Sequence, residues 1–256
     1  MVRPSVTAPR LSIVIPALNE QRSLVPLLDD IAALRTAVEL IVVDGGSTDD
    51  TCDVARRGGA RVVGAERGRG IQLRTGGLHA TAPMLCFLHA DVRIPQQARR
   101  TLETIAHAGE HGAWAFRLRI DGARRAYRAI EWSANTRSSL LGLPYGDQGL
   151  VISRSRYDAV GGYSDLPIME DVAIARVLRR TGGITLLPAS LLVSPRRWER
   201  DGALRRSIRN AWLLTRYLTG TAPSVLSRRY RPHSLARDGV DRGESRGAAR
   251  GVGPEH

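Results

Sequence analysis

The chain has 256 residues, 43% of them hydrophobic, which suffices for one large or two small domains with a sizeable core. Its 38 basic residues are all arginines and outnumber 25 acidic residues, and the net charge of +13 favours phosphate-bearing partners, either nucleotides or anionic lipid headgroups. Aromatic residues make up only 5% of the chain, too few for a base-stacking surface, so nucleic acid is not an expected partner.

Strand and helix signals alternate through the first half of the chain, which predicts an α/β fold with a mostly parallel sheet and covering helices. Pro16 is expected to end the first strand, and Asn19 or Ser23 to cap the first helix. The expected strands are 11–15, 39–43, 60–65 and 84–88, and the expected helices run from 19 or 23 to 34, from 48 or 49 to 58, and from 71 to 81.

The second half is less regular. The expected elements are strands at 114–120, 150–153 and 184–193, helices at 124–141 and 171–180, and an amphipathic helix at 204–218. We expect a flexible N-terminus at 1–10, a single domain at 11–230, and a disordered basic tail at 231–256.

The tripeptide His89-Ala90-Asp91 follows the apolar run 84–88, so a buried strand delivers an aspartate to its C-terminal tip, where open α/β sheets place their ligands. Asp44, after another strand, and the pair Glu170-Asp171, before a helix, stand where they can share that site. A strand-tip carboxylate suits a hard cation that bridges phosphates, and a carboxylate on a separate loop suits general base chemistry. This division of labour fits a sugar-nucleotide transferase.

Polar residues also follow the first two strands. Asn19 and Glu20 can hold the base and ribose of a nucleotide, or they can simply cap a helix. In Asp44-Gly45-Gly46-Ser47 the glycines let the backbone approach a ligand, although an ordinary strand-to-helix turn uses the same residue types. Neither a Gly-x-Gly-x-x-Gly turn after a strand nor a Walker P-loop is present, which counts against a dinucleotide-binding fold.

The segments 13–20 and 42–51, in this order and with the strand-tip aspartate at the expected interval, resemble the family 2 glycosyltransferases with a GT-A fold. The resemblance covers roughly residues 11–230 and implies a nucleotide-binding half at 11–95 and an acceptor half at 96–230. It implies a nucleotide pocket that is lined or approached by Pro16, Asn19, Glu20, Asp44, Ser47, Arg69 and Gln72.

The family usually carries Asp-x-Asp where this chain has His89-Ala90-Asp91, and the resemblance narrows to a bacterial branch with the His-Ala-Asp form. Asp91 then corresponds to the aspartate that binds Mn²⁺ or Mg²⁺. A neutral His89 can donate to the nucleotide or ligate manganese, and a structural histidine under the strand tip is the alternative.

The resemblance also assigns roles in the acceptor half. Asp147 and Gln148 face the sugar and acceptor, or alternatively form a tight turn, and Arg197 pairs with the diphosphate. Glu170-Asp171 matches the acidic pair of inverting members, in which Asp171 is the catalytic base, and capping of the following helix is the alternative.

These inferences predict an inverting, metal-dependent glycosyltransferase that moves a sugar from a nucleotide-diphosphate donor, UDP-linked, to an acceptor hydroxyl or carboxyl. The amphipathic helix 204–218 and the basic tail favour a lipidic acceptor, such as a carotenoid acid, whereas plain core packing of the helix is the alternative. No apolar run reaches the roughly 18 residues of a membrane span, and the two cysteines lack metal or redox spacing, so we expect a cytoplasmic protein that can contact the inner face of the membrane.

Two other functions are open. A non-catalytic nucleotide-sugar-binding protein is conceivable because the first aspartate of the metal motif is missing. A nucleotidyltransferase is less favoured, since the segment 16–20 lacks the glycine-rich loop with Arg and Lys that such enzymes carry.

Overall fold

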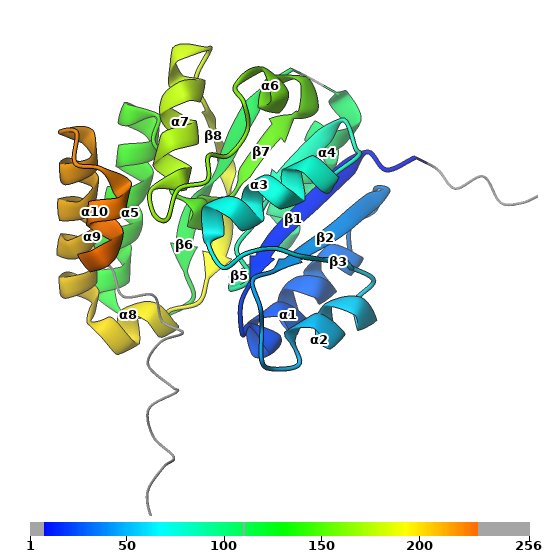
Figure 1. Cartoon of the computed structure of the whole chain (residues 1–256), viewed down its shortest axis with the longest axis horizontal. Coiled ribbons are helices and arrows are strands. Elements are labelled where there is room, and N and C mark those ends of the chain that lie inside the picture. The colour runs from blue at the N-terminus through cyan, green and yellow to red at the C-terminus, as the bar shows by residue number, and fades with distance from the viewer. Residues whose placement is uncertain (1–7, 110, 230–256) are drawn as a thin grey trace, which may run out of the picture.

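The computed structural model describes residues 8–109 and 111–229. An eight-stranded sheet forms the centre of the molecule, in the order β3-β2-β1-β4-β7-β6-β8-β5 (Figure 1). The expected tail 231–256 lies outside the described residues, as does most of the expected flexible segment 1–10.

The sheet is mostly parallel, as the sequence predicts. Its bounds are β1 (Leu11–Ala17), β2 (Val38–Asp44), β3 (Arg61–Gly64), β4 (Met84–Phe87), β5 (Val92–Arg93), β6 (Ala113–Ile120), β7 (Leu150–Ser153) and β8 (Thr185–Val193). Strands β1 to β4 run parallel to one another, and β6 pairs parallel with β8. Only β7 and β5 run antiparallel to their neighbours.

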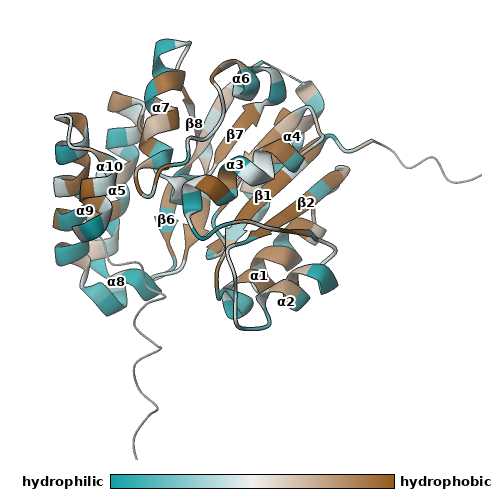
Figure 2. Ribbon diagram, in the orientation of Figure 1, coloured by the Kyte–Doolittle hydropathy of each residue, from teal (hydrophilic) through white to brown (hydrophobic). Residues whose placement is uncertain are grey.

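Helices cover both faces of the sheet because successive strand residues point to opposite sides. Ile13 and Ile15 pack in the core with α1 (Gln21–Ala32), α2 (Thr51–Arg57), α4 (Gln96–Ala108) and α5 (Arg125–Leu141). Val14 lies in the other core with α3 (Arg69–His79), α6 (Arg154–Ala159) and α7 (Glu170–Arg180). The strands between these helices are largely hydrophobic (Figure 2).

A third cluster lies at the end of the molecule where the chain leaves the sheet. It joins Leu143, Met169 and Val172 to Leu213 and Leu226. The last two residues belong to α9 (Ala203–Leu218) and α10 (Pro223–Arg229), which follow α8 (Arg196–Asp201) (Figure 1). Among the residues that the structure describes, no helix is both long enough and apolar enough to cross a bilayer.

Helix α3 packs tightly against strand β1 and against the loop that contains Leu166. A Cβ at Gly76 would stand 2.2 Å from Val14 Cγ1, and one at Gly70 would stand 2.7 Å from the carbonyl oxygen of Leu166. Both glycines therefore permit an approach that a side chain would prevent.

Two expectations at the first strand and helix are wrong. Strand β1 continues through Pro16 to Ala17. The Val14 carbonyl accepts from Leu88 N on the β4 side, so Pro16 points to that side as well, where β4 has ended and no ladder bond needs its missing N–H. Helix α1 begins at Gln21 after Glu20, so neither Asn19 nor Ser23 caps it.

Other boundaries differ by a few residues. Helix α2 begins at Thr51, two or three residues later than expected. The Asp49 carboxylate accepts a hydrogen bond from Thr51 N, so Asp49 lies in the loop before the helix. Helix α3 begins two residues earlier than expected, at Arg69. Five elements were not predicted, namely β5, α4, α6, α8 and α10, and most of these are too short to show a period.

Candidate active site

A cavity of about 80 Å³ opens where β4, α3, α7 and α8 meet. Five predicted site residues line it together: Arg69, His89, Asp147, Asp171 and Arg197. The other lining residues are Tyr145, Gly146, Ile168, Met169, Arg206, Asn210 and Leu213. The fold therefore gathers at one place residues that are up to 128 positions apart in the sequence, from Arg69 to Arg197.

Asp91 follows the tip of β4, and its side chain is 1% exposed. Its Oδ2 lies 3.0 Å from Arg197 Nε and 3.5 Å from Arg196 Nη2. Burial opposes ionisation, but the two guanidinium charges hold the pKa of Asp91 below its ordinary value. Its Oδ1 is buried and has no hydrogen-bond partner among the described residues. Asp91 is therefore an ionised carboxylate with one oxygen available to a ligand.

His89 lies two residues earlier, and both of its ring nitrogens are buried without a hydrogen-bond partner in the described part of the chain. Burial, reinforced by the charges of Arg69 and Arg197, lowers the pKa of His89 to about 3. The imidazole is thus neutral at physiological pH. Gly146 packs directly on it, since a Cβ at that position would lie 2.4 Å from His89 Nε2.

The donors present fit a cation that is shared with a bound diphosphate. Asp91 Oδ1 is an orphaned buried oxygen of the kind that Mn²⁺ and Mg²⁺ accept, and the orphaned His89 nitrogens could ligate Mn²⁺. Within residues 8–109 and 111–229, no three or more His, Cys, Asp and Glu side chains gather into a complete ligand set. A cation held here would need phosphate oxygens and water to complete its coordination, which is the usual situation for Mg²⁺.

Asp171 stands at the start of α7, where the helix dipole favours a negative charge. Its Oδ2 accepts a hydrogen bond from Gly146 N at 2.9 Å, and its Oδ1 accepts one from Val172 N at 2.8 Å. The side chain is only partly buried and lines the cavity. The carboxylate is thus held in place by backbone donors while it keeps access to a ligand.

Glu170, its neighbour, is placed differently. Its side chain is 1% exposed and forms an ion pair with Arg69 Nε. Burial raises the pKa of Glu170, the Asp171 charge adds to the rise, and Arg69 opposes it. The geometry favours a role for Glu170 in positioning Arg69 at the cavity.

Asp147 belongs to a single 3-10 turn, η1 (Gly146–Gln148), and faces the same cavity. Its Oδ1 is buried without a hydrogen-bond partner in the described residues. Burial raises the pKa of Asp147, with Asp171 and Asp91 adding to the rise against Arg137 and Arg197. This orphaned oxygen can accept a hydrogen bond from a ligand hydroxyl.

The predicted nucleotide-binding residues form a second group at the ends of β1 and β2. Asp44 accepts from Gly46 N at 3.0 Å and from Ser47 N at 3.1 Å. Asn19, held at a φ of 54°, donates its N–H to Ser47 Oγ at 2.9 Å. The two loops are thereby fastened to each other, with the half-buried Pro16 at the base of the first.

Arg196 connects the two groups, and sequence reasoning missed it. Its Nη2 lies 2.5 Å from Glu20 Oε2, and its Nη1 donates to Ser23 Oγ at 2.6 Å. Together with its approach to Asp91, these contacts bring the predicted nucleotide end and the predicted cation end within reach of one side chain. The only signal in the sequence was a pair of adjacent arginines after Pro195.

Gln72 and Gln148, two residues predicted to contact the nucleotide sugar, are buried and form hydrogen bonds within the protein. Gln72 Nε2 donates to the carbonyl oxygens of Ala17 and Val43, both at 2.8 Å, and so joins the ends of β1 and β2. Gln148 Oε1 accepts from Ser138 Oγ at 2.6 Å, and its Nε2 donates to Phe116 O at 3.1 Å. Their contact with a donor stays a prediction.

Known proteins resemble this chain in sequence. The sequence profile described as Glycosyl transferase family 2 matches residues 12–162, which is more than half of the chain. An uncharacterized glycosyltransferase of Mycobacterium tuberculosis (strain ATCC 25618 / H37Rv) is 43% identical over 82 residues, or 32% of this chain and 36% of the relative. The 4,4'-diaponeurosporenoate glycosyltransferase of Staphylococcus aureus (strain USA300) is 38% identical over 89 residues, or 32% of this chain and 24% of the relative. The chain thus matches about a third or less of the length of these relatives.

Solved structures share the fold. The mannosyltransferase of Pyrobaculum calidifontis, determined in complex with GDP-mannose and Mn²⁺, aligns with a TM-score of 0.56 and 22% identity. The alignment covers 75% of this chain and 59% of that one. At this identity the likeness establishes the fold alone, and it confirms the expected GT-A type.

Proposed function

Because the chain belongs to glycosyl transferase family 2, we propose that it is a glycosyltransferase that moves a sugar from a nucleotide-diphosphate donor to an acceptor hydroxyl with inversion at the anomeric carbon. The observation that carries the proposal is the placement of Asp171. It is ordered by two backbone donors, lines the cavity, and shares that cavity with Arg69 and Arg197. One side of the cavity can thus accept a proton while another stabilises a departing anion.

In the proposed reaction Asp171 takes the proton of the acceptor hydroxyl while that oxygen attacks the anomeric carbon. The bond from the anomeric carbon to the diphosphate oxygen breaks, and the leaving electron pair stays on the diphosphate. Arg69 and Arg197 stabilise this charge, since guanidinium groups form strong paired hydrogen bonds with phosphate oxygens. Asp147 holds a hydroxyl of the sugar or the acceptor through its orphaned oxygen.

Asp91 and His89 would hold the divalent cation, Mn²⁺ or Mg²⁺, which when bound would neutralise part of the diphosphate charge. The mannosyltransferase structure, which contains Mn²⁺, supports this part of the proposal. Assignment of the chain to a bacterial branch with the His-Ala-Asp form rests on the sequence alone.

The nucleotide would lie across the loops that carry Asn19, Glu20, Asp44 and Ser47, so residues 11–95 form the nucleotide-binding half and 96–230 the acceptor half of one domain. We propose a uridine nucleotide on the strength of the paired motifs at 13–20 and 42–51. GDP-mannose, named for the Pyrobaculum enzyme, makes a guanosine nucleotide the alternative.

For the acceptor we propose a lipid at the inner face of the cell membrane. The Staphylococcus relative is named for diaponeurosporenoate, a carotenoid acid, but this chain matches only 24% of its length. The acceptor group decides the role of Asp171. A carboxylate is already ionised at neutral pH and needs no base, whereas a hydroxyl does.

The test is release of nucleoside diphosphate from a panel of UDP- and GDP-sugars, with and without Mn²⁺. Asp91→Ala and Asp171→Asn should both suppress turnover, and donor binding measured by thermal shift should survive in Asp171→Asn. Donor binding without turnover in the unmodified protein, across the panel, would support a non-catalytic nucleotide-sugar-binding protein. Release of pyrophosphate from a nucleoside triphosphate and a sugar 1-phosphate would identify a nucleotidyltransferase.

A further inference from the structure

Helix α9 has apolar residues on two opposite sides. Its inner side carries Leu213, which is buried, and contributes Arg206 and Asn210 to the cavity. Its outer side carries Leu204, Ile208, Trp212 and Leu218, with exposed fractions of 74%, 60%, 40% and 42%. Leu204, Ile208 and Trp212 recur every fourth residue, so they form one stripe along the helix. A helix that needed only to pack on its own protein would not repeat the apolar pattern on its outer side.

The charged residues of α9 and α10 themselves have one sign, and Asp201, just before α9, pairs with Arg206 and Arg209. Residues 203–229 contain six arginines and no acidic residue. Arg205 and Arg216 are exposed and follow the edge of the stripe. An apolar stripe with a tryptophan and a basic flank is the pattern of helices that lie in the interface of an anionic bilayer.

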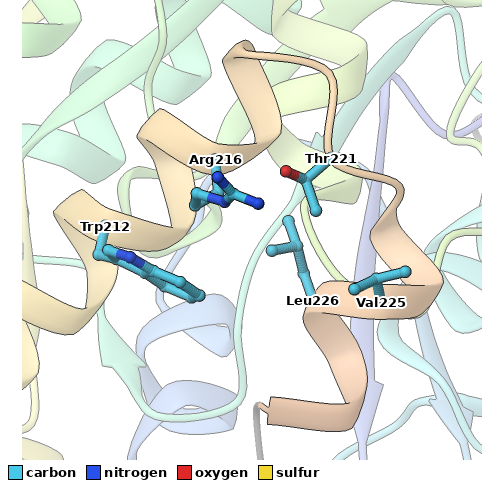
Figure 3. Close-up of a pocket in the computed structure, with 5 residues that line it drawn as sticks. All are labelled: Trp212, Arg216, Thr221, Val225 and Leu226. Atoms are coloured by element: carbon cyan, nitrogen blue, oxygen red, sulfur yellow. The ribbon is translucent and has the colours of Figure 1, made fainter.

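The surface continues onto α10 as a hollow of about 310 Å³. Trp212 and Arg216 line it from α9, Val225 and Leu226 from α10, and Thr221 from the turn between them (Figure 3). Val225 is 50% exposed. The hollow offers apolar walls beside a guanidinium group, which suits an acyl chain attached to an anionic headgroup.

We propose that this surface, made of Leu204, Ile208, Trp212, Leu218 and Val225 with Arg205 and Arg216, docks on an anionic lipid bilayer. Charge complementarity selects this occupant, because a second copy of the chain would bring the exposed Arg205 and Arg216 against the same two arginines of its partner. Docking would hold the opposite side of α9, and with it the cavity, at a fixed distance from the membrane. The proposal extends the proposed function by naming the surface that meets the lipid, but binding to vesicles does not depend on turnover.

The experiment is co-sedimentation of the full chain with vesicles of phosphatidylcholine, with and without phosphatidylglycerol. We expect binding to the anionic vesicles that weakens with salt. Ile208→Ser should weaken it about tenfold, since the variant removes apolar area from the interface. Arg205→Gln combined with Arg216→Gln should weaken it roughly 30-fold.

Leu78→Ser on α3 is the matched control, because Leu78, like Ile208, is an exposed aliphatic residue (75% and 60% exposed) but lies on another helix. It should bind as the unmodified chain does. Circular dichroism confirms that each variant is folded. Equal binding by the Ile208 and Leu78 variants would overturn the proposal, as would a dimer in light scattering that Ile208→Ser dissociates. Unchanged turnover on a soluble acceptor in the Ile208 variant would separate lipid docking from the chemistry.

Discussion

Replacing each member of the neighbouring acidic pair by its amide, Glu170→Gln and Asp171→Asn, separates a structural carboxylate from a catalytic one. Glu170 is buried and ion-paired with Arg69, whose side chain is 36% exposed. Breaking a fully buried ion pair costs about 3–5 kcal/mol, but Arg69 can turn partly to water, so we expect a loss of about 2 kcal/mol. For a domain of this size that lowers Tm by roughly 4–8 °C.

Asp171→Asn should behave in the opposite way. The amide oxygen can still accept one of the two backbone hydrogen bonds from Gly146 and Val172, so stability should fall by only about 1 kcal/mol. Turnover should fall by a factor of about 10²–10⁴, because an amide cannot take the proton from the hydroxyl of the acceptor substrate. Calorimetry measures the first quantity, and nucleoside diphosphate release under donor saturation measures the second. Loss of turnover in Glu170→Gln at unchanged Tm, with an active Asp171→Asn, would refute these roles.

Three further predictions concern the cation site, the cavity wall and the junction of α8 with α9. His89→Asp adds a carboxylate beside Asp91, so the variant should be less stable than the unmodified chain when no ligand is bound. Addition of Mn²⁺ with a nucleoside diphosphate should raise the Tm of the variant by more than it raises the Tm of the unmodified chain. An equal rise in both proteins would contradict a cation at this position. Gly146→Ala should cost about 1–3 kcal/mol and weaken donor binding in calorimetry, because its Cβ would clash with His89, whereas Gly64→Ala, whose Cβ meets nothing within 4 Å, should stay within about 0.5 kcal/mol. Burial raises the pKa of Asp201, but ion pairs with three arginines outweigh this and lower the pKa to about 2. The ionised carboxylate therefore stabilises the protein above about pH 4, and this stabilisation is lost as the pH falls toward 2. Asp201→Asn should lower the free energy of unfolding by about 1–2 kcal/mol at pH 7, and denaturant titration should show that the difference disappears at pH 2.

The sequence predicts the sheet well because most of its strands are short apolar runs bounded by turn residues, and residues 114–120 alternate between apolar and polar side chains. It also predicts that Asp91 and Asp171 share a site, and the family resemblance adds Asp147; in the structure the charges of Asp91 and Asp171 both act on Asp147. Helix α8 escapes prediction because six residues are too few to show a helical period.

Long-range pairing is the part that local pattern cannot reach. Arg196 bonds to Glu20, 176 residues away, and nothing near either residue announces the other. Gln148 has the polarity of a ligand contact, but the structure buries its amide among Ser138 and Phe116. Whether a polar side chain faces a ligand or fastens the framework depends on packing that only the folded chain specifies.

Because α3 packs closely on β1, the residues beneath this helix determine where Arg69 is placed. Gly76 rests on Val14 and Gly70 rests on the Leu166 carbonyl, and Arg69 stands at the first turn of this helix. A single methyl group at position 76 would raise the helix, and the guanidinium would rise with it, away from Glu170 and the cavity. The distance between α3 and the sheet thus sets the position of the Arg69 guanidinium. A substitution on the side of α3 that faces the sheet would therefore weaken anion binding without touching the ligand.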